Sequence, residues 1–174
     1  MGYLPIFVDA SGRHCVVIGG GEIAERKTRS LIGAGAAVTV VSPSLTPGLA
    51  ELAERGTVRH HARRYRTGDL AGAFLVYEAT GEIETGRAAA AEAQAGAMLI
   101  NVADVPELCS FIAPAVIKRG GLQIAVSTGG ASPAFARRIR EELEDRFGPE
   151  YELMVEMLAT ARKPANTRSR PSIS

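Results

Sequence analysis

The sequence carries almost no net charge and contains no long apolar run, and each absence excludes a class of protein. Its 20 Lys and Arg residues nearly balance 19 Asp and Glu residues, so bulk electrostatics indicate neither a nucleic-acid nor a membrane partner. No apolar stretch approaches the roughly 20 residues that cross a bilayer. The opening "MGYLPIFVDASGR" lacks the basic segment and apolar core of a signal peptide. We therefore expect a cytoplasmic protein.

Cysteine and histidine are also scarce, and their positions do not indicate a metal site. Cys15 lies in an apolar run, where a free cysteine packs as a small hydrophobic residue. The other cysteine, Cys109, belongs to no CxxC motif or His/Cys cluster. His60 and His61 are neighbours in a strand-like segment, so their side chains point to opposite faces and cannot bind one ion together. We expect no metal ligands.

What the sequence does have is a regular alternation of apolar strand-like runs with longer helix-like segments. The runs "HCVVIGG", "AVTVVSP", "TVRHHARRY", "AFLVYEAT" and "AMLINVAD" predict five strands, and helices are predicted over residues 22–36, 45–56 and 84–96. This pattern indicates βαβ crossovers and a parallel sheet buried on both faces. The sequence predicts an α/β fold in which residues 1–112 form a Rossmann-like, dinucleotide-binding domain.

After residue 112 the pattern changes to a hairpin followed by helices. "FIAPAVIKRGGLQIAVSTGG" predicts two antiparallel strands, and the next segment predicts a helix capped by Ser132 with Pro133 at its first position. Residues 113–149 thus form a small α+β region, 150–163 a short C-terminal helical segment, and 164–174 a disordered tail. Because a hairpin with two helices is too small for a core of its own, we expect it to pack on the first domain or against a second copy.

The first strand runs into a glycine loop. Gly19, Gly21 and Ala24 give G-x-G-x-x-A between a strand and a helix, the arrangement in which a dinucleotide pyrophosphate approaches the backbone and the helix N-terminus. The next strand ends in Ser42 and Pro43 rather than in the carboxylate that usually binds the adenine ribose. The loop predicts a dinucleotide cofactor, and this strand end does not distinguish NAD from NADP.

Two further segments lie where ligands are expected. "NVAD" ends the fifth strand and places Asn101 and Asp104 at the carboxyl edge of the sheet, where Asp104 is either a general base or a turn-forming residue ahead of Pro106. "STGGASP", residues 127–133, repeats the strand–glycine–helix arrangement with Arg137 close behind. This second loop is either an anion site or a plain strand-to-helix turn.

Taken together, "LPIFVDASGRHCVVIGGGEIAERK", "NVAD", "CSFIAPA" and "VSTGGASPAFARRIRE" resemble the siroheme synthase N-terminal family from residue 3 to about 150. The resemblance implies an NAD-dependent precorrin-2 dehydrogenase that forms sirohydrochlorin, in siroheme or cobalamin synthesis, and an intertwined homodimer. Some members are also sirohydrochlorin ferrochelatases, and the sequence leaves that second activity open. Asp104 takes the position of the family's general acid/base.

The resemblance and the two glycine loops together name the remaining site residues. The expected cofactor contacts are Gly19, Gly21, Glu22, Ile23, Ala24, Ser42, Pro43, Ser44, Thr80 and Asn101. Precorrin-2 carries several carboxylates, which favours the second loop as a substrate anchor. Its expected contacts are Ser127, Thr128, Gly129 and Arg137.

One competing interpretation belongs to a different functional class. A non-catalytic module that senses NAD(H) through a dimer would also need the first glycine loop. Such a sensor needs neither a carboxylate at the sheet edge nor a second anion loop, so the sequence favours the enzyme.

Overall fold

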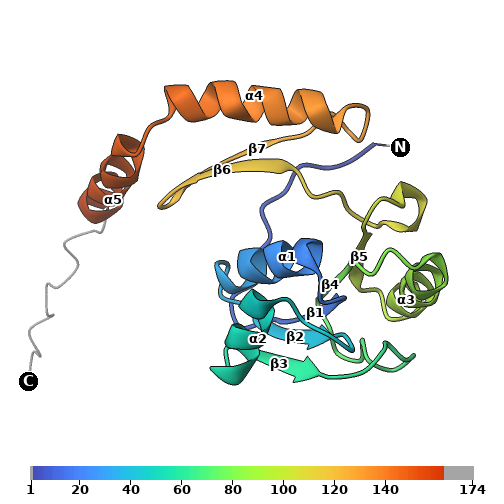
Figure 1. Cartoon of the computed structure of the whole chain (residues 1–174). Helices are drawn as coiled ribbons and strands as arrows, with labels where there is room; N and C mark the ends of the chain where they lie inside the picture. Colours follow the sequence, from blue (N-terminus) through green and yellow to red (C-terminus); the bar gives the residue numbers. More distant parts are fainter. Residues whose placement is uncertain (1, 163–174) are drawn as a thin grey trace, which may run out of the picture. The chain divides into compact units, whose positions relative to one another are not determined.

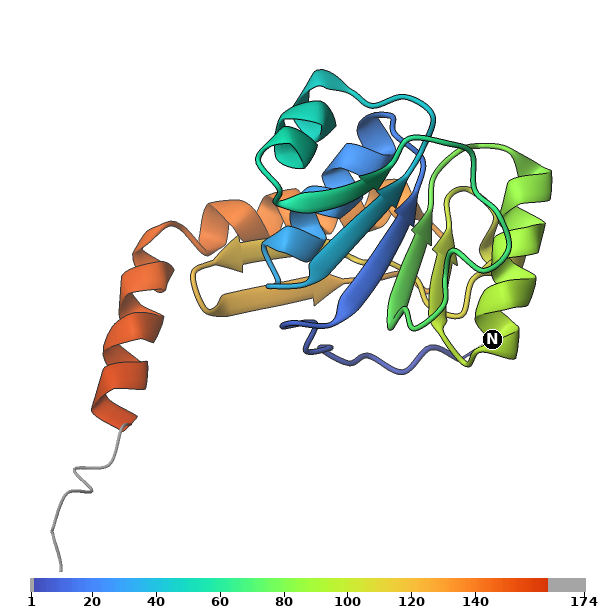
Figure 2. The same ribbon diagram turned by 90° about the horizontal axis from the view of Figure 1, so that it is seen from below.

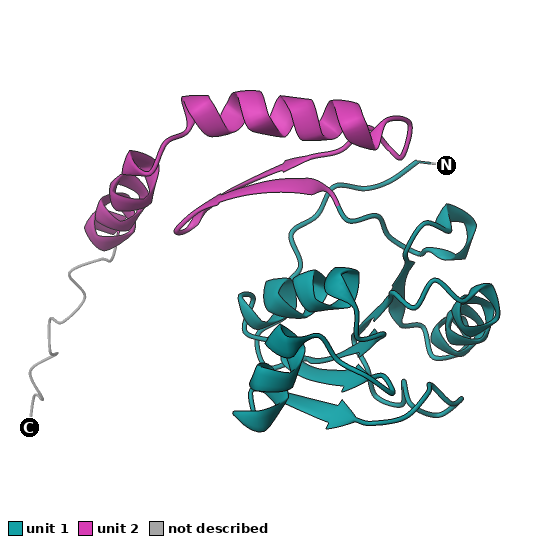
Figure 3. Ribbon diagram, in the orientation of Figure 1, with its two compact units in different colours: residues 1–113 teal, residues 114–174 magenta. Residues whose placement is uncertain are grey.

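The computed structural model describes residues 2–162, and the tail predicted over 164–174 lies outside them. The chain divides into two compact units, Met1–Ala113 and Pro114–Ser174 (Figure 3). The first unit contains a five-stranded sheet in the order β3-β2-β1-β4-β5, in which every neighbouring pair is parallel. Its strands are β1 (His14–Ile18), β2 (Ala37–Val41), β3 (Val58–His61), β4 (Leu75–Glu78) and β5 (Leu99–Val102).

Helices cover both faces of this sheet (Figures 1 and 2). One face buries apolar side chains against α1 (Glu22–Ile32) and α2 (Pro47–Glu54), and the other buries them against α3 (Ile83–Ala95). Because strands buried on both faces need apolar residues at successive positions, β1 and β2 are almost entirely buried. The predicted Rossmann-like α/β fold is confirmed.

The residues of α1 that pack against the sheet do not follow a simple spacing of four. A spacing of four joins Ile23, Lys27 and Leu31 in the sequence, but the helix buries Ala24, Thr28 and Leu31. Ile23 stays 39% exposed in the first turn. The small side chains of Ala24 and Thr28 let the helix lie close to the sheet. Longer side chains at these two positions would hold the helix further away.

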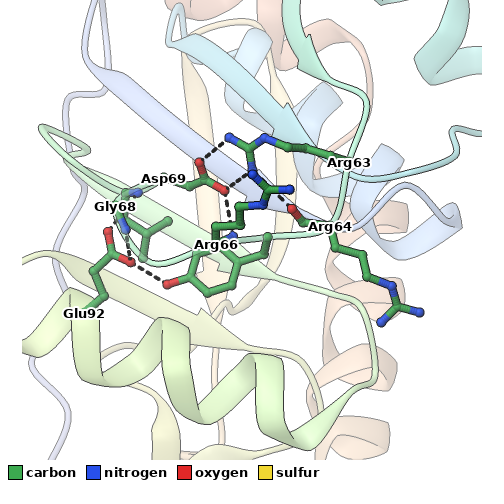
Figure 4. Close-up of polar contacts among 8 residues, drawn as sticks. Arg63, Arg64, Arg66, Gly68, Asp69 and Glu92 are labelled. Carbon is green, nitrogen blue, oxygen red and sulfur yellow. Dashed lines mark hydrogen bonds and ion pairs between the residues drawn. The ribbon is translucent and has the colours of Figure 1, made fainter.

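A polar network holds the segment between β3 and β4 (Figure 4). Glu92 on α3 accepts hydrogen bonds from the Tyr65 hydroxyl at 2.5 Å and from the Gly68 and Leu70 amides at 3.0 Å. Arg63 donates to both oxygens of Asp69, each at 2.6 Å, and these bonds lower the pKa of the Asp69 carboxyl. A segment without regular structure is thus fixed against the sheet, and Leu70 is fully buried in the core.

The second unit is an antiparallel hairpin with two helices. Strands β6 (Ala115–Arg119) and β7 (Leu122–Val126) form the predicted antiparallel hairpin, and Gly120 and Gly121 make its two-residue turn. Helices α4 (Pro133–Arg146) and α5 (Glu150–Arg162) follow. Ser132 caps α4, with its hydroxyl accepting from the Phe135 amide at 3.3 Å, and Pro133 occupies the first turn.

Candidate functional site

The candidate site lies at the carboxyl edge of the five-stranded sheet. Strand order reverses beside β1, since β2 lies on one side of it and β4 on the other. In open α/β sheets, ligands bind outside the carboxyl ends of the strands at such a reversal. Three loops leave the sheet there, after β1, β2 and β4, and a fourth follows β5.

The loop after β1 is packed so tightly that two of its glycines have no room for a side chain. Gly19 has φ +120°, and a Cβ added there would lie 2.7 Å from the carbonyl oxygen of Ala79. A Cβ at Gly20 would lie 1.8 Å from the carbonyl oxygen of Ser44. The backbone of the loop after β2 therefore packs closely against Gly20, and that of the loop after β4 against Gly19. The pattern G-x-G-x-x-A leaves Gly20 free to vary, so sequence reasoning missed its role.

Gly21 differs from its neighbours because it faces open space. A Cβ added there meets no atom of the described chain within 4 Å. Gly21 is also the N-cap of α1 and supplies no capping side chain, so the first-turn N–H groups lack a side-chain partner. Glu22 and Ile23, expected cofactor contacts, are both exposed in this turn. Open space in front of unpaired N–H groups and the positive end of a helix dipole fits a pyrophosphate.

The three expected cofactor contacts after β2, Ser42, Pro43 and Ser44, differ in their exposure to solvent. Ser42 is buried, and its hydroxyl donates to the carbonyl oxygen of Ser44 at 2.7 Å. The carbonyl oxygen of Ser42 in turn accepts from Nε2 of His60 at 2.9 Å. Ser42 therefore shapes the bend, whereas Pro43 and Ser44 are exposed at the sheet edge.

The Glu25 side chain joins helix α1 to the loop after β2. The Thr46 hydroxyl, at the N-cap of α2, donates to one oxygen of Glu25 at 2.5 Å, and Arg29 donates to the other at 2.6 Å. Both bonds lower the pKa of the Glu25 carboxyl. Gly48 packs against this pair: a Cβ there would lie 2.1 Å from a Glu25 oxygen, so the Glu25 and Arg29 side chains would have to shift to admit one. The glycine loop and the loop after β2 are thus held as one assembly.

The loop after β4 is held by a buried carboxylate that sequence reasoning missed. Glu78 is 2% exposed and accepts hydrogen bonds from the amide of Thr80, at 2.8 Å, and from its hydroxyl. The Thr80 hydroxyl also accepts from the Glu82 amide at 3.0 Å. Thr80, an expected cofactor contact, is therefore fixed beside the Gly19 turn. A charged residue inside the apolar run "AFLVYEAT" was the available signal for Glu78.

Asp104 lies in the turn after β5 and is exposed. Its φ of +61° is a left-handed conformation that Asp tolerates better than most residues. Within residues 2–162 its carboxylate makes no hydrogen bond or ion pair, so it does not stabilise the turn as an Asx-turn would. The backbone conformation fits a turn residue, and the unengaged carboxylate at the sheet edge fits a proton acceptor.

The loop that carries Asp104 is fastened by its neighbours. The side-chain amide of Asn101 donates to the carbonyl oxygen of Phe111 at 3.1 Å. The Cys109 thiol donates to the carbonyl oxygens of Val102 and Val105, at 3.3 and 3.4 Å, and burial raises its pKa. Asn101 thus has a local structural role, and Cys109 stays a neutral thiol rather than a reactive thiolate.

The second glycine loop belongs to the second unit. Thr128 closes it, since its hydroxyl accepts from the Ser132 amide at 3.0 Å and donates to the Ser132 carbonyl oxygen at 3.1 Å. Gly129 has φ +64° with open space at its Cβ position, and its amide donates to the Ser127 hydroxyl at 3.1 Å. Arg137, exposed on α4, has no carboxylate partner within residues 2–162. Its neighbours Arg138 and Arg140 are both paired with glutamates.

Residues 2–162 contain neither a metal-ligand cluster nor a membrane-spanning helix. No group of three or more His, Cys, Asp or Glu side chains is arranged to hold a metal ion. None of the helices in that range is long and apolar enough to cross a membrane.

Comparisons with known proteins agree with this geometry. Residues 6–115, more than half of the chain, match the model of a putative NAD(P)-binding family, and residues 119–146 match that of the sirohaem biosynthesis protein central region. A precorrin-2 dehydrogenase structure, SirC, superposes with a TM-score of 0.80 and 29% identity, over 92% of this chain and 79% of that one.

Relatives of known name are longer proteins. A siroheme synthase from Methylobacillus flagellatus is 44% identical over 95% of this chain and 35% of its own length. A siroheme synthase from Chromobacterium violaceum is 44% identical over 87% of this chain and 32% of its own length. The chain therefore spans about a third of the length of these relatives. It belongs to the putative NAD(P)-binding family, and its resemblance to siroheme synthases is confirmed.

Proposed function

We propose that this chain oxidises precorrin-2 to sirohydrochlorin with NAD⁺ as the hydride acceptor. The reaction removes one hydride and one proton from a tetrapyrrole, so the protein must hold an oxidant and provide a proton acceptor. The open space over Gly21 at the N-terminus of α1 supports the cofactor assignment. When bound there, NAD⁺ supplies the nicotinamide that takes the hydride.

In this proposal Asp104 takes the proton. The observation that carries the assignment is an exposed carboxylate with no partner inside residues 2–162, fixed by its backbone at the carboxyl edge of the sheet. A proton acceptor needs a lone pair within reach of the substrate, which this exposed carboxylate offers, whereas a carboxylate used only to shape a turn would bond to the backbone. The second loop, with Arg137, is assigned to binding substrate carboxylates, because guanidinium groups pair with carboxylates in two-bond geometry.

A turnover assay separates this enzyme from a non-catalytic NAD(H)-sensing module. Precorrin-2 and NAD⁺ incubated with the protein without oxygen should give the sirohydrochlorin spectrum together with NADH absorbance. A sensor would bind NAD⁺ and leave precorrin-2 unchanged. Binding of NAD⁺ without turnover would therefore reject the enzyme and support the sensor.

We also propose that the protein is a homodimer through its second unit. Among residues 114–162 of this unit, only two apolar residues are buried, Ile117 and Ala136, which is too few for an independent core. A two-stranded sheet alone is marginally stable in water. Large apolar side chains of this unit are instead exposed: Val116, Phe135, Leu153, Met154, Met157 and Leu158. A second copy would cover such a surface.

Sedimentation velocity tests this assembly. The wild-type chain should sediment at twice its 18.3 kDa mass. Met157→Glu places a charge among the exposed apolar residues of α5 and should shift the population towards monomer, because burying an unpaired charge in an interface is costly. Glu156→Lys, in the same turn, is the matched control and should remain dimeric. A wild-type protein that is monomeric at micromolar concentration would contradict the proposal.

A further inference from the structure

Lys27, on α1, is half-buried and has no carboxylate partner within residues 2–162. Its ammonium group lies 4.6 Å from the centre of the Tyr77 ring. The other cations of this helix differ from it: Arg29 pairs with Glu25 at 2.6 Å, and Arg26 is exposed. Lys27 is therefore the cation of α1 that is withdrawn from water without a counter-ion.

The surroundings of Lys27 lead to the loop that carries Asp104. Tyr77 pairs in register with Asn101, whose amide holds the Phe111 carbonyl oxygen. The Phe111 ring meets the Tyr77 ring edge-on, with their centres 5.6 Å apart. Lys27 thus lies over the β4–β5 side of the sheet, against the segment that closes the Asp104 loop.

This environment disfavours the charged form of the lysine. Burial lowers the pKa of the Lys27 ammonium, and the neighbouring Arg26 lowers it further. The Tyr77 ring offsets part of that cost, since a desolvated cation is attracted to the face of an aromatic ring. The rest of the cost would be offset by an oxyanion that binds beside the ammonium.

We propose that Lys27 binds a carboxylate of the tetrapyrrole substrate and so positions it near the Asp104 loop. This inference rests on the proposed function, because it takes the polycarboxylate substrate from there. A cofactor phosphate is the other oxyanion available. It fits the geometry less well, since Lys27 lies five residues beyond the Glu22 amide, roughly 7–8 Å along the helix axis at 1.5 Å per residue.

Equilibrium titration with sirohydrochlorin, followed by its absorbance, tests the inference without relying on turnover. Lys27→Met keeps an unbranched apolar side chain over Tyr77 and removes the charge. Its affinity for sirohydrochlorin should fall about 10- to 100-fold, the loss expected for one charged hydrogen bond. Its KM for precorrin-2 should rise similarly with kcat within about threefold, while its Kd for NAD⁺ and its Tm stay near the wild-type values.

Two further variants complete the design. Arg26→Met, which removes the exposed neighbouring charge, should bind sirohydrochlorin as the wild type does, and Lys27→Arg should recover most of the lost affinity. Unchanged sirohydrochlorin affinity in Lys27→Met would overturn the inference. A loss of NAD⁺ affinity in its place would also overturn it and assign the lysine to the cofactor. Failure of the proposed function would appear in the wild type itself, as no oxidation of precorrin-2.

Discussion

Asp104→Asn should lower kcat for precorrin-2 oxidation by about 10²- to 10⁴-fold, the usual contribution of a general base. The amide cannot accept the proton that leaves as the hydride is transferred. Its Kd for NAD⁺ should stay within twofold of the wild-type value, because the cofactor phosphates are assigned to the glycine loop. Stopped-flow measurement of NADH formation, with NAD⁺ binding measured by calorimetry, checks both expectations.

Asn is a better replacement than Ala because of the backbone at this position. Asp104 has φ +61°, which Asn adopts readily and Ala does not, so Asp104→Ala would mix strain with loss of the carboxylate. Glu107→Gln is the matched control, since it neutralises another exposed carboxylate of the same loop and should keep kcat within about twofold. Wild-type turnover in Asp104→Asn would remove the proposed role of this residue.

Alanine substitutions at two adjacent glycines of the first loop should have different effects, one on stability and the other on NAD⁺ affinity. Gly20→Ala would bring its Cβ to 1.8 Å from the Ser44 carbonyl oxygen, so the loops after β1 and β2 would have to separate. We expect this change to cost at least about 3 kcal/mol of folding free energy, at the upper end for overpacked sites. Gly21→Ala adds its Cβ to open space, so its folding free energy should stay within about 1 kcal/mol of the wild-type value. Its NAD⁺ affinity should fall at least about tenfold, because the methyl group occupies the expected position of the pyrophosphate.

Chemical denaturation and NAD⁺ titration of both variants separate the two effects. Stable, NAD⁺-binding Gly20→Ala protein would contradict the close packing described for this loop. Gly21→Ala protein with unchanged NAD⁺ affinity would mean that the dinucleotide phosphates lie elsewhere.

The fold was predictable from the sequence because each element obeys a local rule. Buried parallel strands need continuous apolar runs, and β1 and β2 have them. The α4 helix begins at Pro133 with Ser132 as its cap, which is the standard combination. The hairpin turn falls at Gly120–Gly121, and Gly120 has the positive φ that glycine adopts readily.

The contacts that support the loops of the site were not predictable in this way. The Glu78 carboxylate accepts a hydrogen bond from the Thr80 amide at the end of β4. The Ser42 hydroxyl donates to the Ser44 carbonyl oxygen and is therefore not available to bind a ribose. Lys27 faces Tyr77, fifty residues away in the sequence. No spacing rule predicts the contact between Lys27 and Tyr77, because it depends on how α1 packs on β4 and not on any one segment. Residue types therefore indicated a site at this edge of the sheet, while the structure showed which side chains support its loops.

The ratio of NADH to sirohydrochlorin formed is the decisive test of whether this chain oxidises precorrin-2 with NAD⁺. In the absence of oxygen, purified protein with excess NAD⁺ should form one NADH for each sirohydrochlorin produced from precorrin-2, and no sirohydrochlorin without NAD⁺ beyond the uncatalysed background. Sirohydrochlorin formed without matching NADH, or NAD⁺ bound with no product at all, would contradict the account.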